Sequence, residues 1–85
     1  MMINKENLIK KIIYRSSHRG TKEMDILLSS FVNKYIYNLN LRDLNDLSTL
    51  LLIDDEILSE LYFNKVENEK IPKTKIYSLL KSHKI

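Results

Sequence analysis

Only one glycine and one proline occur among the 85 residues of this chain, and their scarcity limits the folds open to it. Tight β-hairpins depend on glycine and similar turn residues, so we do not expect short strands joined by such turns. Because 44% of the residues are hydrophobic and 29% are charged, the chain can form one core and cover it. The composition therefore predicts a single small domain, residues 1–85, built from helices.

Apolar residues recur at intervals of three and four, which predicts an all-α fold, a compact bundle of about five helices. The expected helices span residues 4–17, 21–37 and 41–52, then from 54 or 55 to about 64, with a fifth after a loop at 65–70. Asn40 should cap the third helix, and Asp54 or Asp55 the fourth. Pro72 suits the first turn of the fifth helix. In the third helix, a leucine repeat that begins at Leu41 should face the core.

Residues that could support catalysis or bind a metal are scarce. The chain has no cysteine, which excludes disulfides, thiolate ligands and thiol nucleophiles. His18 and His83 stand far apart in the sequence and outside any zinc-binding spacing, and no glycine-rich phosphate loop is present. Asp54 and Asp55 are better explained as helix caps than as a catalytic pair. We therefore expect a protein that is not an enzyme and holds no metal.

No segment approaches the ~20 consecutive apolar residues that cross a bilayer. Residues 1–6 lack the apolar centre of a signal peptide. The expectation is a soluble intracellular protein without membrane insertion.

Charge is divided into three blocks along the chain. Residues 1–22 carry six basic residues and one Glu, so this block is basic. Residues 23–63 carry two basic and eight acidic residues, and residues 64–85 carry six Lys and two Glu. One interpretation is a solvated surface whose blocks attract one another in the fold. The other is a basic face, formed by both ends, that meets an acidic partner or nucleic acid. A nucleic-acid-binding or general protein-interaction module is thus an alternative function, although three arginines are few for it and we expect no nucleic-acid partner.

The single glycine, Gly20, lies in the segment RGTKEMD, residues 19–25, between two strongly apolar stretches. We call this segment the corner. A glycine there either gives the backbone access to positive φ or lets another surface come close. One interpretation is a plain turn, in which Thr21 starts a helix and Glu23 and Asp25 favour its dipole. The other is a docking site, where Arg19 and Glu23 offer directional hydrogen bonds to a partner.

The corner resembles the RGxxExD signature of the SdhE family, assembly factors that promote covalent attachment of FAD to succinate dehydrogenase. The matching residues are Arg19, Gly20, Glu23 and Asp25, with Arg15 as an upstream basic residue. The resemblance covers residues 8–82 and includes the leucine-rich third helix and the acidic start of the fourth. The chain departs from the family by having no tryptophan in the fourth helix, and by His18-Arg19 where a doubly basic pair is common.

The resemblance implies a five-helix protein of the bacterial cytoplasm that binds the flavoprotein subunit of succinate dehydrogenase, and of the related fumarate reductase, and promotes its flavinylation. FAD is then the partner's cofactor, while this chain binds none stably and is a monomer when free. The implied partner-binding residues are Arg15, His18, Arg19, Gly20, Glu23 and Asp25. Among them, we expect Arg19 and Glu23 to make the principal polar contacts and Asp25 to hold the geometry of the corner.

Overall fold

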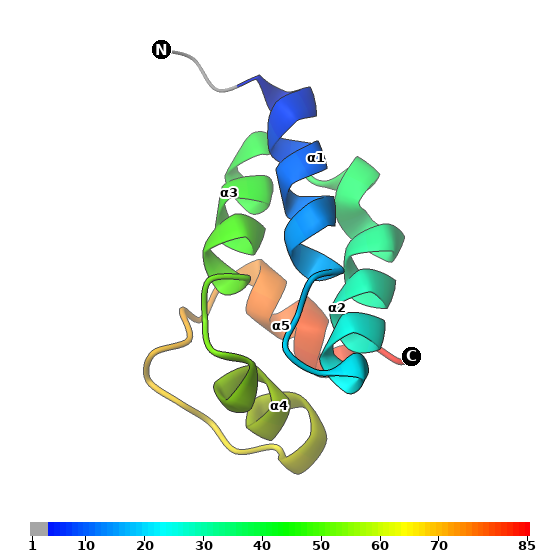
Figure 1. Ribbon diagram of the computed structural model, residues 1–85. Coiled ribbons are helices and arrows are strands. Elements are labelled where there is room, and N and C mark those ends of the chain that lie inside the picture. The colour runs from blue at the N-terminus through cyan, green and yellow to red at the C-terminus, as the bar shows by residue number, and fades with distance from the viewer. Residues whose placement is uncertain (1–3) are drawn as a thin grey trace.

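The computed structural model describes residues 4–85 and has the expected all-helical architecture (Figure 1). Residues 1–3 of the expected domain lie outside the described part. The elements are α1 (Lys5–Ser16), α2 (Lys22–Tyr35), the short 3₁₀ helix η1 (Ile36–Asn38), α3 (Leu41–Leu50), α4 (Asp55–Asn64) and α5 (Lys75–Ser82). Residues 4–85 contain no strand, so the prediction of an all-α bundle of about five helices is confirmed.

Short polar side chains begin four of the helices, because each accepts a hydrogen bond from a backbone N–H of the first turn. These N-cap residues are Asn4, Thr21, Asn40 and Thr74. The cap at Asn40 confirms the prediction for the third helix, whose Asp43 N–H lies 2.8 Å from the Asn40 Oδ1. Asp54 occupies the N-cap position of α4, but its side chain makes no capping hydrogen bond.

The structure corrects the start of the fifth helix and the ends of two others. Pro72 precedes α5 rather than lying in its first turn, because Thr74 is the residue that caps the helix. The α-helix of α2 ends at Tyr35 and continues only as the single turn of η1. α3 ends at Leu50, two residues before its expected end, where Leu52 N–H bonds to the Thr49 carbonyl. This tighter i→i+3 hydrogen bond closes the last turn of a helix.

The core is one cluster of apolar side chains from all five helices, η1 and the loops. α1 packs against α2 and α3, while α5 packs against α3 and α4. Phe31 is the largest of the fully buried side chains. Leu41 was predicted to face the core, but this residue is 48% exposed. It is the first residue of α3, one turn outside Leu44, which is the first leucine of that repeat to be buried.

Four polar contacts hold the C-terminal part of the chain in place. The Tyr62 hydroxyl donates to the His83 carbonyl over 2.6 Å, and the His83 Nε2 lies 3.0 Å from the Ser30 hydroxyl. In the 65–74 loop, the Glu67 carboxylate accepts from Lys81 Nζ over 2.7 Å and from the Tyr77 hydroxyl. These contacts hold α5 against α2 and α4 and hold the loop against α5.

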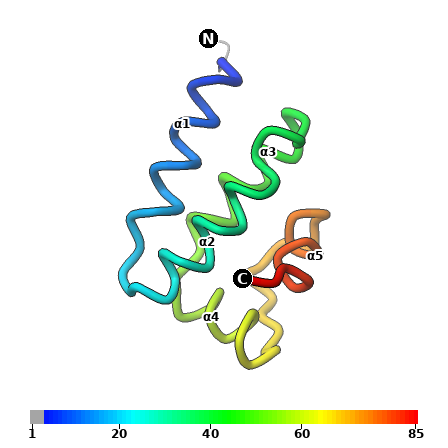
Figure 2. The backbone as a smooth tube through the Cα atoms, turned by 90° about the vertical axis from the view of Figure 1, so that its right-hand side faces the viewer, coloured from blue at the N-terminus to red at the C-terminus, as the bar shows by residue number. Residues whose placement is uncertain are grey.

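The two basic ends of the sequence do not come together in the fold. Figure 2 shows α1 and α5 on different sides of the molecule, with α2 and α3 between them. Helices α1 and α5 therefore lie apart, whereas the interpretation of one basic face required the two ends of the chain to come together. Within residues 4–85, no helix is long and apolar enough to cross a membrane.

Candidate functional site

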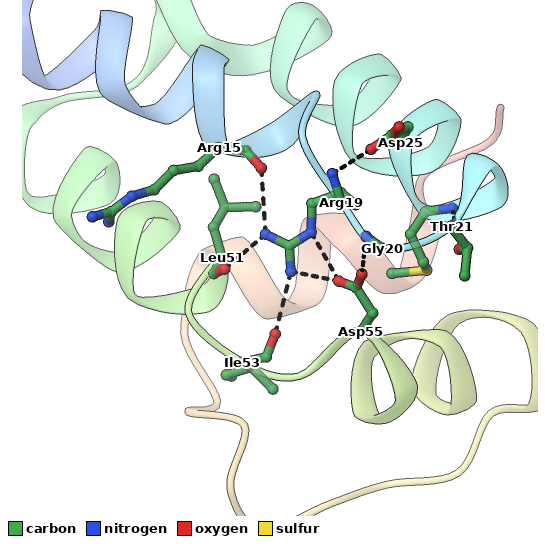
Figure 3. Close-up of polar contacts among 9 residues, drawn as sticks. Arg15, Arg19, Gly20, Thr21, Asp25, Leu51, Ile53 and Asp55 are labelled. Carbon is green, nitrogen blue, oxygen red and sulfur yellow. Dashed lines mark hydrogen bonds and ion pairs between the residues drawn. The ribbon is translucent and has the colours of Figure 1, made fainter.

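The corner connects α1 to α2, and hydrogen bonds hold it in place at both ends (Figure 3). Thr21 Oγ1 accepts from Met24 N–H over 3.3 Å and so begins α2. Asp25, in the first turn of α2, accepts a hydrogen bond from Arg19 N–H over 2.5 Å. Asp25 thus takes the structural role expected of it, because its carboxylate fixes the backbone immediately before Gly20.

The Arg19 side chain points into the protein and is only 10% exposed. Its Nε donates to Asp55 Oδ1 over 2.8 Å, and its Nη2 lies 2.5 Å from the same oxygen. The remaining N–H groups reach backbone carbonyls, namely those of Arg15 at 3.4 Å, Leu51 at 2.8 Å and Ile53 at 3.3 Å. Carbonyls at a helix end lack partners within the helix, and Arg19 supplies them for the ends of α1 and α3. One guanidinium therefore joins α1, the α3–α4 loop and α4 (Figure 3).

Asp55 is the residue of this site that sequence reasoning assigned differently. The sequence predicted that either Asp54 or Asp55 caps the fourth helix. In the structure, both carboxylate oxygens of Asp55 instead contact the corner. Oδ1 pairs with Arg19, and Oδ2 accepts from Gly20 N–H over 2.9 Å. The adjacent pair Asp54-Asp55 was a visible signal, but periodicity and capping rules report only local structure. They could not show that Asp55 pairs with a residue 36 positions earlier.

Gly20 is exposed, and the fold does not explain why this residue is a glycine. Its φ is not positive, so that part of the sequence interpretation is wrong. Within residues 4–85 the left-handed residue is Lys65, at the end of α4, with φ 58°. A Cβ added at Gly20 would lie 3.4 Å from Asp55 Oδ2, an ordinary contact. Of the two reasons for a glycine here, close approach by another surface is the one that remains.

The other predicted residues present their side chains outside the Arg19–Asp55 contact. Glu23 is exposed in the first turn of α2 and forms no ion pair with any residue of 4–85. His18 is exposed, and its Nδ1 lies 2.7 Å from the Tyr14 carbonyl. Arg15 is half-buried, and its guanidinium points away from that of Arg19 (Figure 3).

The residues of the corner, together with Asp55 of α4, therefore fall into two groups. Arg19, Asp25 and Asp55 hold its shape through internal hydrogen bonds, whereas Gly20 and Glu23 face outward from that frame. No group of three or more His, Asp or Glu side chains within residues 4–85 is placed to hold a metal ion.

Comparison with known proteins identifies the family of this chain. A family model described as "Flavinator of succinate dehydrogenase" matches residues 10–84. The protein "Succinate dehydrogenase assembly factor 2, mitochondrial" of Dictyostelium discoideum is 33% identical over 78 residues, which cover 92% of this chain and 55% of that protein. The chain thus spans about half the length of this curated relative. No solved structure matches the chain. Because the family model covers nearly the whole domain, corner included, this chain belongs to the family of succinate dehydrogenase flavinators, the SdhE type that its RGTKEMD motif resembles.

Proposed function

We propose that this chain binds the flavoprotein subunit of succinate dehydrogenase and promotes the covalent attachment of FAD to that subunit. Membership of the flavinator family supports the assignment. The name of the Dictyostelium relative, an assembly factor for the same enzyme, points the same way.

In this proposal the chain supplies neither a nucleophile nor a base nor a cofactor. The flavoprotein links the flavin to its own histidine, and the chain holds that subunit in a conformation in which the two reacting groups are aligned. Orienting two reactants removes a large entropic part of a barrier without any catalytic side chain from the helper. The corner suits such a role because its buried polar groups are occupied by contacts within the chain.

The observation that carries the proposal is the glycine that the fold does not require. Gly20 has no positive φ and its position has space for a Cβ, yet it stands at the exposed tip of a rigid frame. We infer that Gly20 lets the partner's backbone approach and that Glu23, exposed one helical turn away, accepts a hydrogen bond from it. Arg15 and His18 line the same surface. Arg19 and Asp25 then contribute by positioning the corner.

Co-expression with the flavoprotein subunit, followed by flavin fluorescence of that subunit in a denaturing gel, tests the proposal. Wild-type chain should raise the covalent flavin signal, whereas Glu23→Ala and Gly20→Leu should reduce it to the level without the chain. Glu69→Ala is the matched control, because Glu69 is an exposed carboxylate in the 65–74 loop, away from the corner. It should behave as wild type. Equal fluorescence with and without the wild-type chain would refute the assignment.

A further inference from the structure

Tyr14 is an exposed aromatic residue that is nevertheless held in one orientation. The residue is 62% exposed. Its ring stacks on the imidazole of His18, one turn further along, with ring centroids 3.9 Å apart and planes inclined by 18°. Most exposed tyrosines are free to change rotamer, so a stacked one has already lost part of its conformational entropy.

His18 is itself fixed to the end of α1. Its Nδ1 lies 2.7 Å from the Tyr14 carbonyl and 3.2 Å from the Ser17 hydroxyl. Because a carbonyl only accepts, Nδ1 carries the proton in this hydrogen bond. The next residue is Arg19, whose backbone N–H is bound to Asp25. The Tyr14–His18 pair is therefore connected to the same rigid frame that presents Gly20.

We propose that Tyr14, supported by His18, is the aromatic anchor of the docking surface and inserts into a recess on the flavoprotein subunit. This inference rests on the proposed function. Tyrosine is enriched among the residues that dominate binding energy at interfaces, because it combines a large apolar ring with a polar tip. A ring that is ordered before binding loses less entropy on association than a mobile one.

The charges around Tyr14 indicate the chemistry of the recess. Lys11 and Arg15 flank Tyr14 on α1, and neither forms an ion pair with a carboxylate of residues 4–85. Lys10, by contrast, pairs with Glu6 at 3.7 Å. A partner surface that complements this arrangement has an apolar floor for the ring and carboxylates at its edge.

Titration calorimetry of the purified flavoprotein subunit with variants of the chain tests the anchor. Tyr14→Ala should weaken binding about 30-fold or more, the range expected for an interface hot spot. Tyr14→Phe keeps the ring and should stay within about 3-fold of wild type. Tyr37→Ala is the matched control, because Tyr37 is 74% exposed in η1, outside the corner, and it should bind as wild type does. Equal affinities for Tyr14→Ala and Tyr37→Ala would overturn the proposal.

His18 is a positioning residue in this proposal, and its variants separate support of the ring from direct contact. His18→Phe can still stack on Tyr14 and should restore most of the affinity that His18→Ala loses. Lys11→Gln should reduce the salt dependence of binding, as expected when a charge pair across the interface is removed. If His18→Phe binds no better than His18→Ala, the positioning role is wrong.

The same titrations distinguish failure of this inference from failure of the proposed function. If wild-type chain does not bind the flavoprotein at all, the function itself is wrong. If wild type binds and Glu23→Ala does not, while Tyr14→Ala binds as wild type, only the anchor is refuted.

Discussion

Replacing Asp55 with alanine tests whether this carboxylate holds the corner together. The substitution removes the partner of Arg19 Nε and Nη2, and also the acceptor for Gly20 N–H. The Arg19 side chain is only 10% exposed in the native protein, and without Asp55 its guanidinium keeps three carbonyl partners, at Arg15, Leu51 and Ile53, but no counter-charge. The variant should therefore be destabilised through an uncompensated, poorly hydrated charge rather than through lost packing.

The expected loss in the free energy of unfolding depends on how deeply the Arg19–Asp55 pair is buried. Removing one partner of a fully buried ion pair costs about 3–5 kcal/mol. The Asp55 side chain is 24% exposed, so water reaches part of the site and screening reduces the cost. We expect a loss of about 2–3 kcal/mol in the free energy of unfolding, against a total of roughly 4–13 kcal/mol for a domain of this length. The melting temperature should fall by roughly 10–20 °C.

Urea denaturation followed by far-ultraviolet circular dichroism measures this loss. Asp54→Ala is the matched control, since Asp54 is an exposed neighbour whose side chain makes no capping hydrogen bond. It should change the free energy of unfolding by no more than about 0.5 kcal/mol. If the two alanine variants lose the same stability, the Arg19–Asp55 pair does not hold the corner and the reasoning is refuted.

A double-mutant cycle then isolates the pair. Once Arg19 is alanine, Asp55 has lost its cationic partner, so the second substitution should cost little more. The double variant should lie within about 1 kcal/mol of Arg19→Ala alone, because residues in direct contact are not additive. Fully additive losses would place the contribution of Asp55 outside this contact.

Three further predictions, for Gly20, His83 and Glu67, can be checked by measuring the free energy of unfolding of variants. Gly20→Ala should leave the free energy of unfolding unchanged or raise it by up to about 1 kcal/mol, and a loss larger than that would show that the fold needs the glycine. Burial, followed by the charge of Lys34, lowers the pKa of His83 below 6.5. As the pH drops below 6.5, the unfolded chain therefore binds a proton at this histidine more readily than the folded chain does, and the free energy of unfolding should fall. His83→Phe should lose that part of the pH dependence. The hydrogen bond from Lys81, followed by that from Tyr77, lowers the pKa of Glu67 from 4.5 to about 2. Its stabilisation should therefore be present above pH 4.5 and disappear toward pH 2, and Glu67→Gln should flatten that limb of the urea midpoint against pH.

The helices and two of their caps, Thr21 and Asn40, could be predicted from the sequence because both features are local. Periodicity of apolar residues and a cap such as Asn40 or Thr21 involve residues three or four positions apart. The start of α5 was misplaced because Pro72 and Thr74 are both good helix-start residues, and only the capping hydrogen bond decides between them. Leu41 satisfied the periodic pattern but lies at a helix end that the core does not reach.

The sequence predicted the connection between the first two helices, but not the contacts that hold it in place. The motif located the corner, while the pairing of Arg19 with Asp55 depends on how α4 folds back on the α1–α2 connection. No local rule contains that information. Arg19 was expected to contact a partner, and the structure shows that its side chain also has a full set of contacts within the chain.

The division within the corner has a consequence for reading mutations in the RGxxExD motif. A substitution at Arg19 removes contacts that join three parts of the fold, so lost flavinylation in such a variant is expected even if the partner never touches the guanidinium. A substitution at Glu23 removes an exposed carboxylate with no ion pair among residues 4–85, so under the proposed function lost flavinylation there is expected to come from the interface. Stability and flavinylation measured on the same variants therefore separate residues that shape the docking surface from residues that make its contacts. Gly20→Ala is the most informative of them, because an unchanged or higher stability combined with lost flavinylation would assign the glycine to the partner alone.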